Sequence, residues 1–346
     1  MINILVIGSL PPPVGGTSIS LQHLVIALGK REDIQLEVIN TAGIRNFGLR
    51  GSYRFFCLVK EIVTIVRRSD VVTLHVGLHA LPAIASILWT ICRLSGRPLL
   101  IRRFGGNDHR ELRGLAFRLV DWTIRRADLY LVQTQSLVRA AKGAGIKNVE
   151  WFPTSRPAAP KSVPINSTKN SCRRFIFLSH VKPTKGIHEL ITATERFCGK
   201  VTVDVYGPFY DGLNKSTFDG CKYVHYRGVV PPEAIGETLK QHDAFLLPTY
   251  YEGEGYPGAI IEAFGAGLPV ITTDWKSIPE IVNPNCGLLV PPGNAEALYN
   301  AMSTIVENDA LYRHLSSGAL EQHKFFDLEV WTDHFVEHCR SLAKKT

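Results

Sequence analysis

The stretch Thr249-Tyr-Tyr-Glu-Gly-Glu-Gly-Tyr-Pro-Gly-Ala-Ile-Ile-Glu-Ala-Phe-Gly-Ala-Gly-Leu-Pro-Val-Ile271 contains a strand end, a glycine-rich loop, an apolar helix and a second strand. Seven residues separate Glu254 from Glu262, so a loop carboxylate and a helical carboxylate can face one pocket at the end of a sheet. Pro257 suits the first helical position, and the glycines let the backbone approach a ligand closely. The free N–H groups at the start of that helix attract phosphate. The segment therefore predicts a ligand site between a strand and a helix.

The residues around this pair extend the pattern. A bare pair of glutamates eight positions apart is weak evidence, because many surface helices carry one. With its flanking positions, however, the segment resembles the Glu-x7-Glu signature of retaining glycosyltransferases of family 4. This resemblance implies an α/β protein of the GT-B type, with two Rossmann-like doubly wound domains that face each other across a cleft. The flanking positions are Pro248, Ala263-Phe264, Gly267-Leu268-Pro269-Val270-Ile271 and Pro279-Glu280-Ile281-Val282.

Apolar runs alternate with helical patterns along the whole chain, which predicts parallel βαβ units. A segment rich in Pro and Ser at 156–172 reads as a linker between two such domains. The resemblance implies an acceptor-side domain at 1–155 and a nucleotide-sugar-binding domain at 173–326. By the resemblance, a last helix at 327–346 crosses back to the first domain. The expected elements include strands at Leu99–Phe104, Arg174–Ser179 and Ala244–Pro248, and helices at Thr17–Gly29, Ala259–Ala266, Ser277–Val282, Ala295–Glu307 and Leu328–Ala343.

Length and composition favour a cytoplasmic protein. The 346 residues leave room for two domains of ordinary size. The seven cysteines are scattered, odd in number and lack Cys-x-x-Cys spacing, which favours reduced thiols and argues against a zinc site. The N-terminus lacks the basic front of a signal peptide. The longest uncharged stretch, Val71–Cys92, is interrupted by Gly77 and Pro82, so it predicts a core strand and a buried helix rather than a membrane span.

Charge is uneven along the chain, whose formal net charge is +8. Residues 1–150 contain 20 Lys and Arg against 10 Asp and Glu, whereas residues 151–346 contain 19 against 21. A basic first half suggests an anionic membrane surface or a phospholipid-linked acceptor, and without a nucleic-acid-binding motif we expect no nucleic acid partner. One early stretch fits either an interfacial amphipathic segment or a solvated helix face with core aromatics. It contains Arg45, Phe47, Arg50, Tyr53, Arg54, Phe55, Phe56, Lys60, Arg67 and Arg68.

The loop Ser179-His-Val-Lys-Pro-Thr-Lys-Gly186 follows the first strand expected in the second domain. In the resembled family this loop usually carries an arginine and a lysine that clamp the leaving diphosphate. Lys185 matches the lysine, His180 stands in the arginine position, and Lys182 is an alternative source of positive charge. The resemblance thus implies catalytic roles for Lys185 and His180, although histidine stabilises an anion by charge only when its pKa allows protonation.

The two glutamates take distinct roles by the same resemblance. Glu262 should bind the ribose hydroxyls of the donor nucleotide, and Glu254 should contact hydroxyls of the transferred sugar as a catalytic residue. Two backbone segments should complete the donor site, one against the sugar and phosphate and one against the base. Their residues are Gly255, Tyr256 and Gly258 for the first segment, and Gly228 and Val230 for the second.

The first domain contributes two further loops. The first, Gly8-Ser-Leu-Pro-Pro-Pro-Val-Gly-Gly-Thr-Ser18, is neither a dinucleotide fingerprint nor a Walker loop. It resembles the family's glycine pair, which implies that Gly15, Gly16 and Thr17 approach the donor diphosphate and the acceptor. The second, Arg103-Phe-Gly-Gly-Asn-Asp108, matches a family His-Gly-x-Asp motif at Asp108 but has Gly105 in the histidine position. Arg103 and Asp108 are therefore acceptor-side candidates, and Arg103 pairs either with an acceptor phosphate or with core carboxylates.

The resemblance implies a retaining glycosyltransferase, cytoplasmic and peripheral on the inner face of the membrane. It would move a sugar from a nucleoside-diphosphate sugar, with UDP or GDP, to a glycan or polyprenyl-diphosphate-linked acceptor in surface polysaccharide synthesis. The resemblance implies no cofactor and no metal, and the sequence lacks the Asp-x-Asp of the metal-using class. Two alternatives stay open: a non-catalytic sugar-nucleotide-binding subunit, and a GT-B epimerase or phosphorylase.

Overall fold

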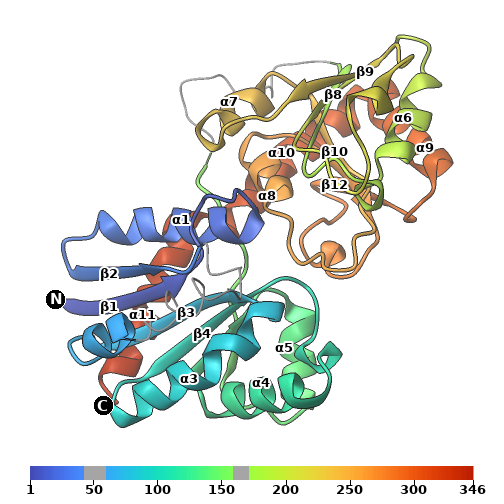
Figure 1. The fold of residues 1–346 in the computed structure, drawn as a ribbon. Coiled ribbons are helices and arrows are strands. Elements are labelled where there is room, and N and C mark those ends of the chain that lie inside the picture. The colour runs from blue at the N-terminus through green and yellow to red at the C-terminus, as the bar shows by residue number, and fades with distance from the viewer. Residues whose placement is uncertain (43–59, 159–170, 346) are drawn as a thin grey trace. The chain divides into compact units, whose positions relative to one another are not determined.

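The structure is a computed structural model that describes residues 1–42, 60–158 and 171–345. It divides the chain into two compact units, Met1–Ser155 with Leu328–Thr346, and Arg156–Asp327 (Figure 1). Each unit is built on one six-stranded parallel sheet. Part of the expected linker and most of the basic and aromatic stretch, including Arg45, Arg50 and Arg54, lie outside the described residues.

The first sheet has the strand order β2-β1-β3-β4-β5-β6. The inner strands β1, β3, β4 and β5 are short apolar runs buried almost throughout, as parallel sheets covered by helices require, whereas the edge strands β2 and β6 are partly exposed. Their bounds are β1 (Ile2–Gly8), β2 (Ile34–Asn40), β3 (Val71–Gly77), β4 (Leu99–Phe104), β5 (Leu129–Val132) and β6 (Val149–Trp151). The helices of this unit include α1 (Gly16–Gly29), α3 (Leu81–Leu94), α4 (Gly114–Arg126), α5 (Gln135–Gly143) and α11 (Leu328–Ala343).

Alternate side chains of β1 enter two different cores, one on each face of the first sheet. Ile4 and Val6 pack in one core with α1 and α11, where Phe335 of α11 is fully buried. Leu5 and Ile7 pack in the other core with α3, α4 and α5. Figure 1 shows the same division of helices between the two faces. The last helix of the chain therefore completes one face of the first sheet.

The second sheet has the order β12-β11-β10-β7-β8-β9, so the chain runs outward in both directions from the central pair β7 and β10. The loops after these two strands flank the point where ligands bind in doubly wound sheets. The strands are β7 (Arg174–Leu178), β8 (Thr202–Tyr206), β9 (Val224–Gly228), β10 (Ala244–Leu247), β11 (Val270–Thr273) and β12 (Gly287–Val290). The helices include α6 (Ile187–Glu195), α7 (Ile235–Lys240), α8 (Gly258–Gly265), α9 (Ala295–Glu307) and α10 (Asp309–Lys324).

Two local expectations were wrong. Residues Ser277–Val282 contain only a short 3-10 helix, Ile278–Glu280, and Pro284, which disfavours the helical conformation at Asn283, prevents its continuation. Pro257 precedes α8 as its N-cap, in an extended conformation, rather than occupying the first helical position. The six cysteines that the structure describes carry free thiols.

Candidate functional site

The loops after β7 and β10 meet through a buried ion pair between Lys185 and Glu254. The Lys185 ammonium group contacts Oε2 of Glu254, and each side chain is only 9% exposed. Oε2 also accepts a hydrogen bond of 2.8 Å from the hydroxyl of Thr249, which is itself fully buried. Two residues 69 positions apart, both predicted from the sequence as catalytic, therefore share one charged, desolvated cluster at the switch point of the sheet.

Gly186 brings these two loops together. Its φ is +80°, and a Cβ atom at this position would lie 2.2 Å from the carbonyl oxygen of Pro248. Only glycine fits such a left-handed conformation against a neighbouring backbone. The N–H of Tyr250 then donates to the carbonyl oxygen of Thr184 at 2.8 Å, which joins the loops beside the ion pair.

His180 and Lys182 line the same region but differ in charge. Burial, and after it the positive charges of Lys185 and Lys182, lower the pKa of His180 below its ordinary value. The imidazole is therefore neutral at neutral pH, and its ring packs 4.4 Å from the ring of Tyr210. The Lys182 ammonium lies 3.8 Å from the ring centroid of Tyr251. Positive charge at this loop thus comes from the two lysines and not from the histidine.

Helix α8 begins directly after the loop that carries Glu254. Tyr256 in that loop is 3% exposed, and its hydroxyl donates to Oε2 of Glu280 at 2.6 Å. The Tyr256 ring also meets Phe326 edge-on. These contacts fix the backbone at Gly255, Tyr256 and Gly258, so the first turn of the helix has a defined position at the end of the sheet.

Glu262 lies in the second turn of α8 and is paired with Arg156. The Nε of Arg156 donates to Oε1 of Glu262 at 2.7 Å, and the two side chains are 3% and 14% exposed. Burial raises the pKa of Glu262, and the positive charge and hydrogen bond of Arg156 oppose that rise. Arg156 belongs to none of the sequence motifs and lies at the start of the linker expected at 156–172. The sequence feature that could have indicated a bulky side chain against α8 is Gly258, in the first turn of this helix.

The predicted base-reading segment lies at the end of the edge strand β9. Gly228 closes that strand with a φ of +96°, and its carbonyl oxygen accepts from the N–H of Gly207 at 2.8 Å. Val229 is exposed and Val230 half-buried. Gly228 and Tyr226 also line a pocket of about 620 Å³ along the same strand.

In the first unit, Gly15 caps α1 and Gly16 begins it. Neither glycine has a positive φ, and a Cβ atom at either position would meet nothing within 4 Å. Nothing inside the protein therefore requires glycine here. The half-buried Thr17 follows, and the Ser18 hydroxyl closes the turn by accepting from Gly15 N–H at 3.1 Å. The backbone of these two glycines therefore borders open space. Glycine at such a position lets a ligand approach the backbone closely.

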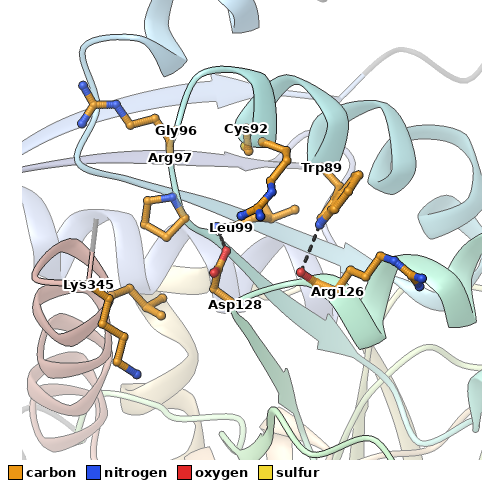
Figure 2. Close-up of a pocket in the computed structure, with 11 residues that line it drawn as sticks. Trp89, Cys92, Gly96, Arg97, Leu99, Arg126, Asp128 and Lys345 are labelled. Carbon is orange, nitrogen blue, oxygen red and sulfur yellow. Dashed lines mark hydrogen bonds between the residues drawn. The ribbon is translucent and has the colours of Figure 1, made fainter.

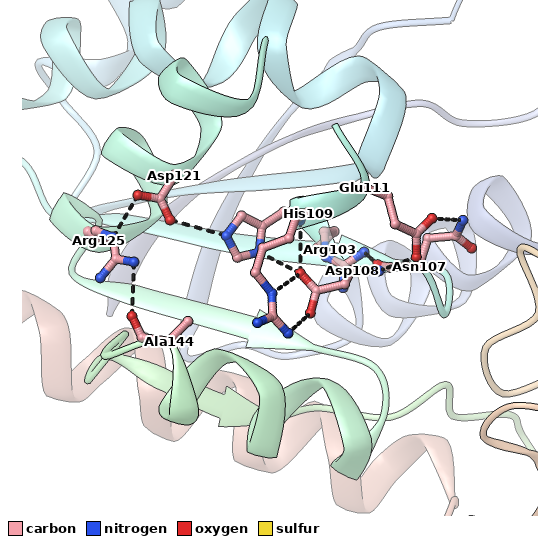
Figure 3. Close-up of polar contacts among 9 residues, drawn as sticks. Arg103, Asn107, Asp108, His109, Glu111, Asp121, Arg125 and Ala144 are labelled. Carbon is pink, nitrogen blue, oxygen red and sulfur yellow. Dashed lines mark hydrogen bonds and ion pairs between the residues drawn. The ribbon is translucent and has the colours of Figure 1, made fainter. Parts of the chain in front are cut away.

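Asp108 and Arg103 belong to a polar network at the end of β4 (Figure 3). The Asp108 carboxylate accepts from the backbone N–H of Arg110 at 2.8 Å and from its guanidinium at 2.9 and 3.1 Å. Although burial alone raises the pKa of Asp108, the hydrogen bonds from Arg110 outweigh it and lower that pKa. His109 lies between Asp108 and Asp121, at 3.3 and 3.2 Å. Asp108 thus holds its own loop together.

Arg103 is 2% exposed, and its guanidinium donates to the carbonyl oxygen of Asn107. Its neighbour Arg102 instead lies over the rings of Phe104 and Phe152, at 4.7 and 4.4 Å from the centroids. Both arginines are therefore part of the interior at this strand end.

A pocket of about 620 Å³ lies at the opposite end of the first sheet, where β4 begins (Figure 2). The C-terminal ends of α3, α4 and α11 converge there. Its cations, Arg93, Arg97, Arg126 and Lys345, complement the partial negative charge of these helix ends. None of the predicted site residues lines it.

Among the described residues, no three His, Cys, Asp or Glu side chains gather in a group that could hold a metal ion. Within the same ranges, no helix combines the length and the apolar character that crossing a bilayer requires.

Residues 172–308 match the family described as "Glycosyl transferases group 1". Among curated relatives, the amylovoran biosynthesis glycosyltransferase AmsK of Erwinia amylovora is 35% identical over 151 residues, 40% of this chain and 37% of that protein. The N,N'-diacetylbacillosaminyl-diphospho-undecaprenol alpha-1,3-N-acetylgalactosaminyltransferase of Campylobacter jejuni is 28% identical over 115 residues, 33% of this chain and 30% of that protein. The chain thus covers about a third of the length of these relatives.

Among solved structures, Anabaena Alr3699/HepE in complex with UDP resembles this chain with a TM-score of 0.77. The similarity covers 98% of this chain and 100% of that one, at 18% sequence identity. Together with the two parallel sheets, this likeness shows that the chain has the GT-B fold, with two Rossmann-like domains.

Proposed function

We propose that the protein is a retaining glycosyltransferase of the family 4 type, with Glu254 and Glu262 as its Glu-x7-Glu pair. It transfers a sugar from a nucleoside-diphosphate sugar, with UDP or GDP as the nucleotide, to a hydroxyl group. One observation carries the proposal: Lys185 and Glu254 meet at the switch point of the second sheet, beside the helix that bears Glu262. All three residues fall within the region 172–308 that matches a glycosyltransferase family.

The chemistry follows from the charges at this point. Breaking the bond between the anomeric carbon and the diphosphate leaves negative charge on phosphate oxygens, which a buried cation and the N-terminus of α8 stabilise. Lys185, assisted by Lys182, supplies the positive charge, and His180 contributes a neutral hydrogen-bonding group. Gly255, Tyr256 and Gly258 offer backbone to the sugar and phosphate. Gly228 and Val230 meet the base.

Retention through a covalent sugar–enzyme intermediate is disfavoured for this site. The resembled family offers no clear nucleophile, and Oε2 of Glu254 is already ion-paired with Lys185 and hydrogen-bonded to Thr249. In the proposed front-face reaction the leaving phosphate oxygen takes the proton of the acceptor hydroxyl as the new bond forms on the same face. Glu254 then holds hydroxyls of the transferred sugar. The reaction as proposed uses no metal.

The acceptor proposal rests on the relatives. One is named for amylovoran biosynthesis and one for a diphospho-undecaprenol-linked substrate. We infer a glycan or polyprenyl-diphosphate-linked acceptor, and a cytoplasmic protein peripheral on the inner face of the membrane. The basic first half of the chain fits such an anionic surface. Asp108 and Arg103 serve the acceptor side through the loop that they hold.

The test is the melting temperature of the full chain with UDP, GDP, ADP and their sugars, since binding to the folded state raises the midpoint. One nucleotide series should shift wild type but not Glu262→Ala, and Glu262→Gln should keep a partner for Arg156 as a control for folding. No shift of wild type with any nucleotide would contradict the proposal. Sugar release without acceptor would favour the epimerase or phosphorylase alternative, and binding without turnover would favour the non-catalytic subunit.

A further inference from the structure

Arg156 lies outside the sequence motifs but contacts the carboxylate proposed to hold the donor ribose. Its side chain is 3% exposed, and its Nε donates to Oε1 of Glu262 at 2.7 Å. The two residues are 106 positions apart in the chain. A buried carboxylate with a planar guanidinium partner has its orientation fixed as well as its charge balanced.

Gly258 supplies the space that this arginine occupies. A Cβ atom built on Gly258 would lie 2.0 Å from Nη2 and 2.6 Å from Cζ of Arg156. Gly258 has no positive φ, so its backbone does not require glycine. The missing side chain at the start of α8 therefore serves the guanidinium, which packs against the first turn of the helix.

The backbone of Arg156 is fixed as well. Its N–H donates to the carbonyl oxygen of Phe326 at 3.0 Å, and it forms a parallel bridge with Asp327. The guanidinium thus projects from an anchored segment. Because the guanidinium cannot easily move, it restricts the rotamer of Glu262. These three observations describe a rigid support for one carboxylate.

We propose that Arg156 is a positioning residue of the donor site, which holds the Glu262 carboxyl group oriented toward the ribose hydroxyls, and that Gly258 leaves the space that the guanidinium requires. The inference rests on the proposed nucleotide-sugar function. In this proposal, Arg156 and Gly258 together position a ligand-binding carboxylate. An ion pair elsewhere in the unit has no such role. The exposed pair of Arg196 with Glu296, 41% and 64% exposed, is the matched control.

The experiment measures the affinity of the full chain for UDP and GDP by isothermal titration, on variants checked for folding by circular dichroism. Arg156→Met should weaken binding about tenfold or more, the effect expected when a hydrogen bond to a charged group is lost. Arg156→Lys keeps the charge but not the planar fork, so it should also weaken binding. Gly258→Ala should do the same, because its methyl group displaces the guanidinium. Arg196→Met should bind as wild type does.

A double-mutant cycle separates positioning from stability. If Arg156 acts through Glu262, Arg156→Met should cause no further loss of affinity in the Glu262→Ala background. Additive losses, or folded Arg156→Met and Arg156→Lys variants that bind as wild type, would overturn the inference and leave the proposed function standing. If Arg156→Met does not fold, the lysine variant and Gly258→Ala decide in the same way. A wild-type chain that binds neither nucleotide would instead reject the function and the inference with it.

Discussion

Replacing Lys185 by methionine tests the charged cluster at the switch point of the second sheet. Methionine keeps most of the length and volume of lysine but removes the ammonium group that contacts Oε2 of Glu254. Because both side chains are 9% exposed, the variant leaves a carboxylate that water can hardly reach. In this variant the hydroxyl of Thr249, 2.8 Å from Oε2, still donates a hydrogen bond to the Glu254 carboxylate.

Breaking a buried ion pair by removing one partner costs about 3–5 kcal/mol of the free energy of unfolding. We expect the lower part of that range, because Thr249 still donates to Glu254. For a domain of this size, each kcal/mol lowers the melting temperature by about 2–4 °C, so the second unit should melt roughly 6–15 °C lower. Removing both charges in Lys185→Met/Glu254→Met should recover much of the loss, since an apolar pair needs no compensation.

Differential scanning calorimetry of the full chain measures the midpoints, with Arg196→Met as the control for an exposed ion pair in the same unit. Nucleotide should raise the midpoint of wild type more than that of Lys185→Met, because the lysine is proposed to hold the diphosphate. A Lys185→Met variant that melts within about 2 °C of wild type would show that the pair carries little stability. A double variant that melts below the single one would refute the argument from uncompensated charge.

Three further predictions concern other parts of the chain. Burial, and then the charge of Arg102, lower the pKa of His75 well below 6.5, so the unfolded chain binds a proton more readily and the free energy of unfolding should fall as the pH drops below 6.5. Urea unfolding between about pH 5 and 7 should show a shallower fall for His75→Gln, and equal slopes would contradict this reasoning. Gly186→Ala should destabilise the second unit by about 1–3 kcal/mol more than Gly212→Ala, because both glycines have positive φ but only the Gly186 Cβ atom would strike a backbone oxygen. Equal melting temperatures of these two variants would show that the loops after β7 and β10 separate without cost. The protein should sediment with anionic liposomes at low salt and dissociate at high salt, and no sedimentation at low salt would remove the membrane proposal.

Much of the fold was predictable because its strands and helices follow strong local patterns. Strand β4 and helices α9 and α11 have the predicted bounds, since each is a continuous apolar run or a clear helical period. The helix expected at Ser277–Val282 is wrong because the segment is too short for its apolar residues to distinguish an α-helix from a single 3-10 turn. Local composition identified the elements but not every interruption.

The site was less accessible from sequence. The glycine-rich loop and the lysine loop were found as motifs. Their contact, however, depends on the close approach of Gly186, after β7, to Pro248, after β10. The partner of Glu262 is 106 residues away and has no motif of its own. The contact of Arg103 with the carbonyl oxygen of Asn107 likewise depends on loop geometry that no local sequence pattern specifies.

The chain enters the second unit at Arg156 and leaves it at Asp327, and these two points are neighbours in one parallel bridge. In topological terms the second unit is an insertion into the first, whose sheet is completed by α11 after the insertion ends. When the two ends of an inserted domain lie side by side, another domain can take its place without moving the flanking segments of the domain that receives it. The matched region 172–308 lies wholly inside this insertion. A different second unit can therefore be joined at these two neighbouring points while the first sheet and its last helix keep their own sequence.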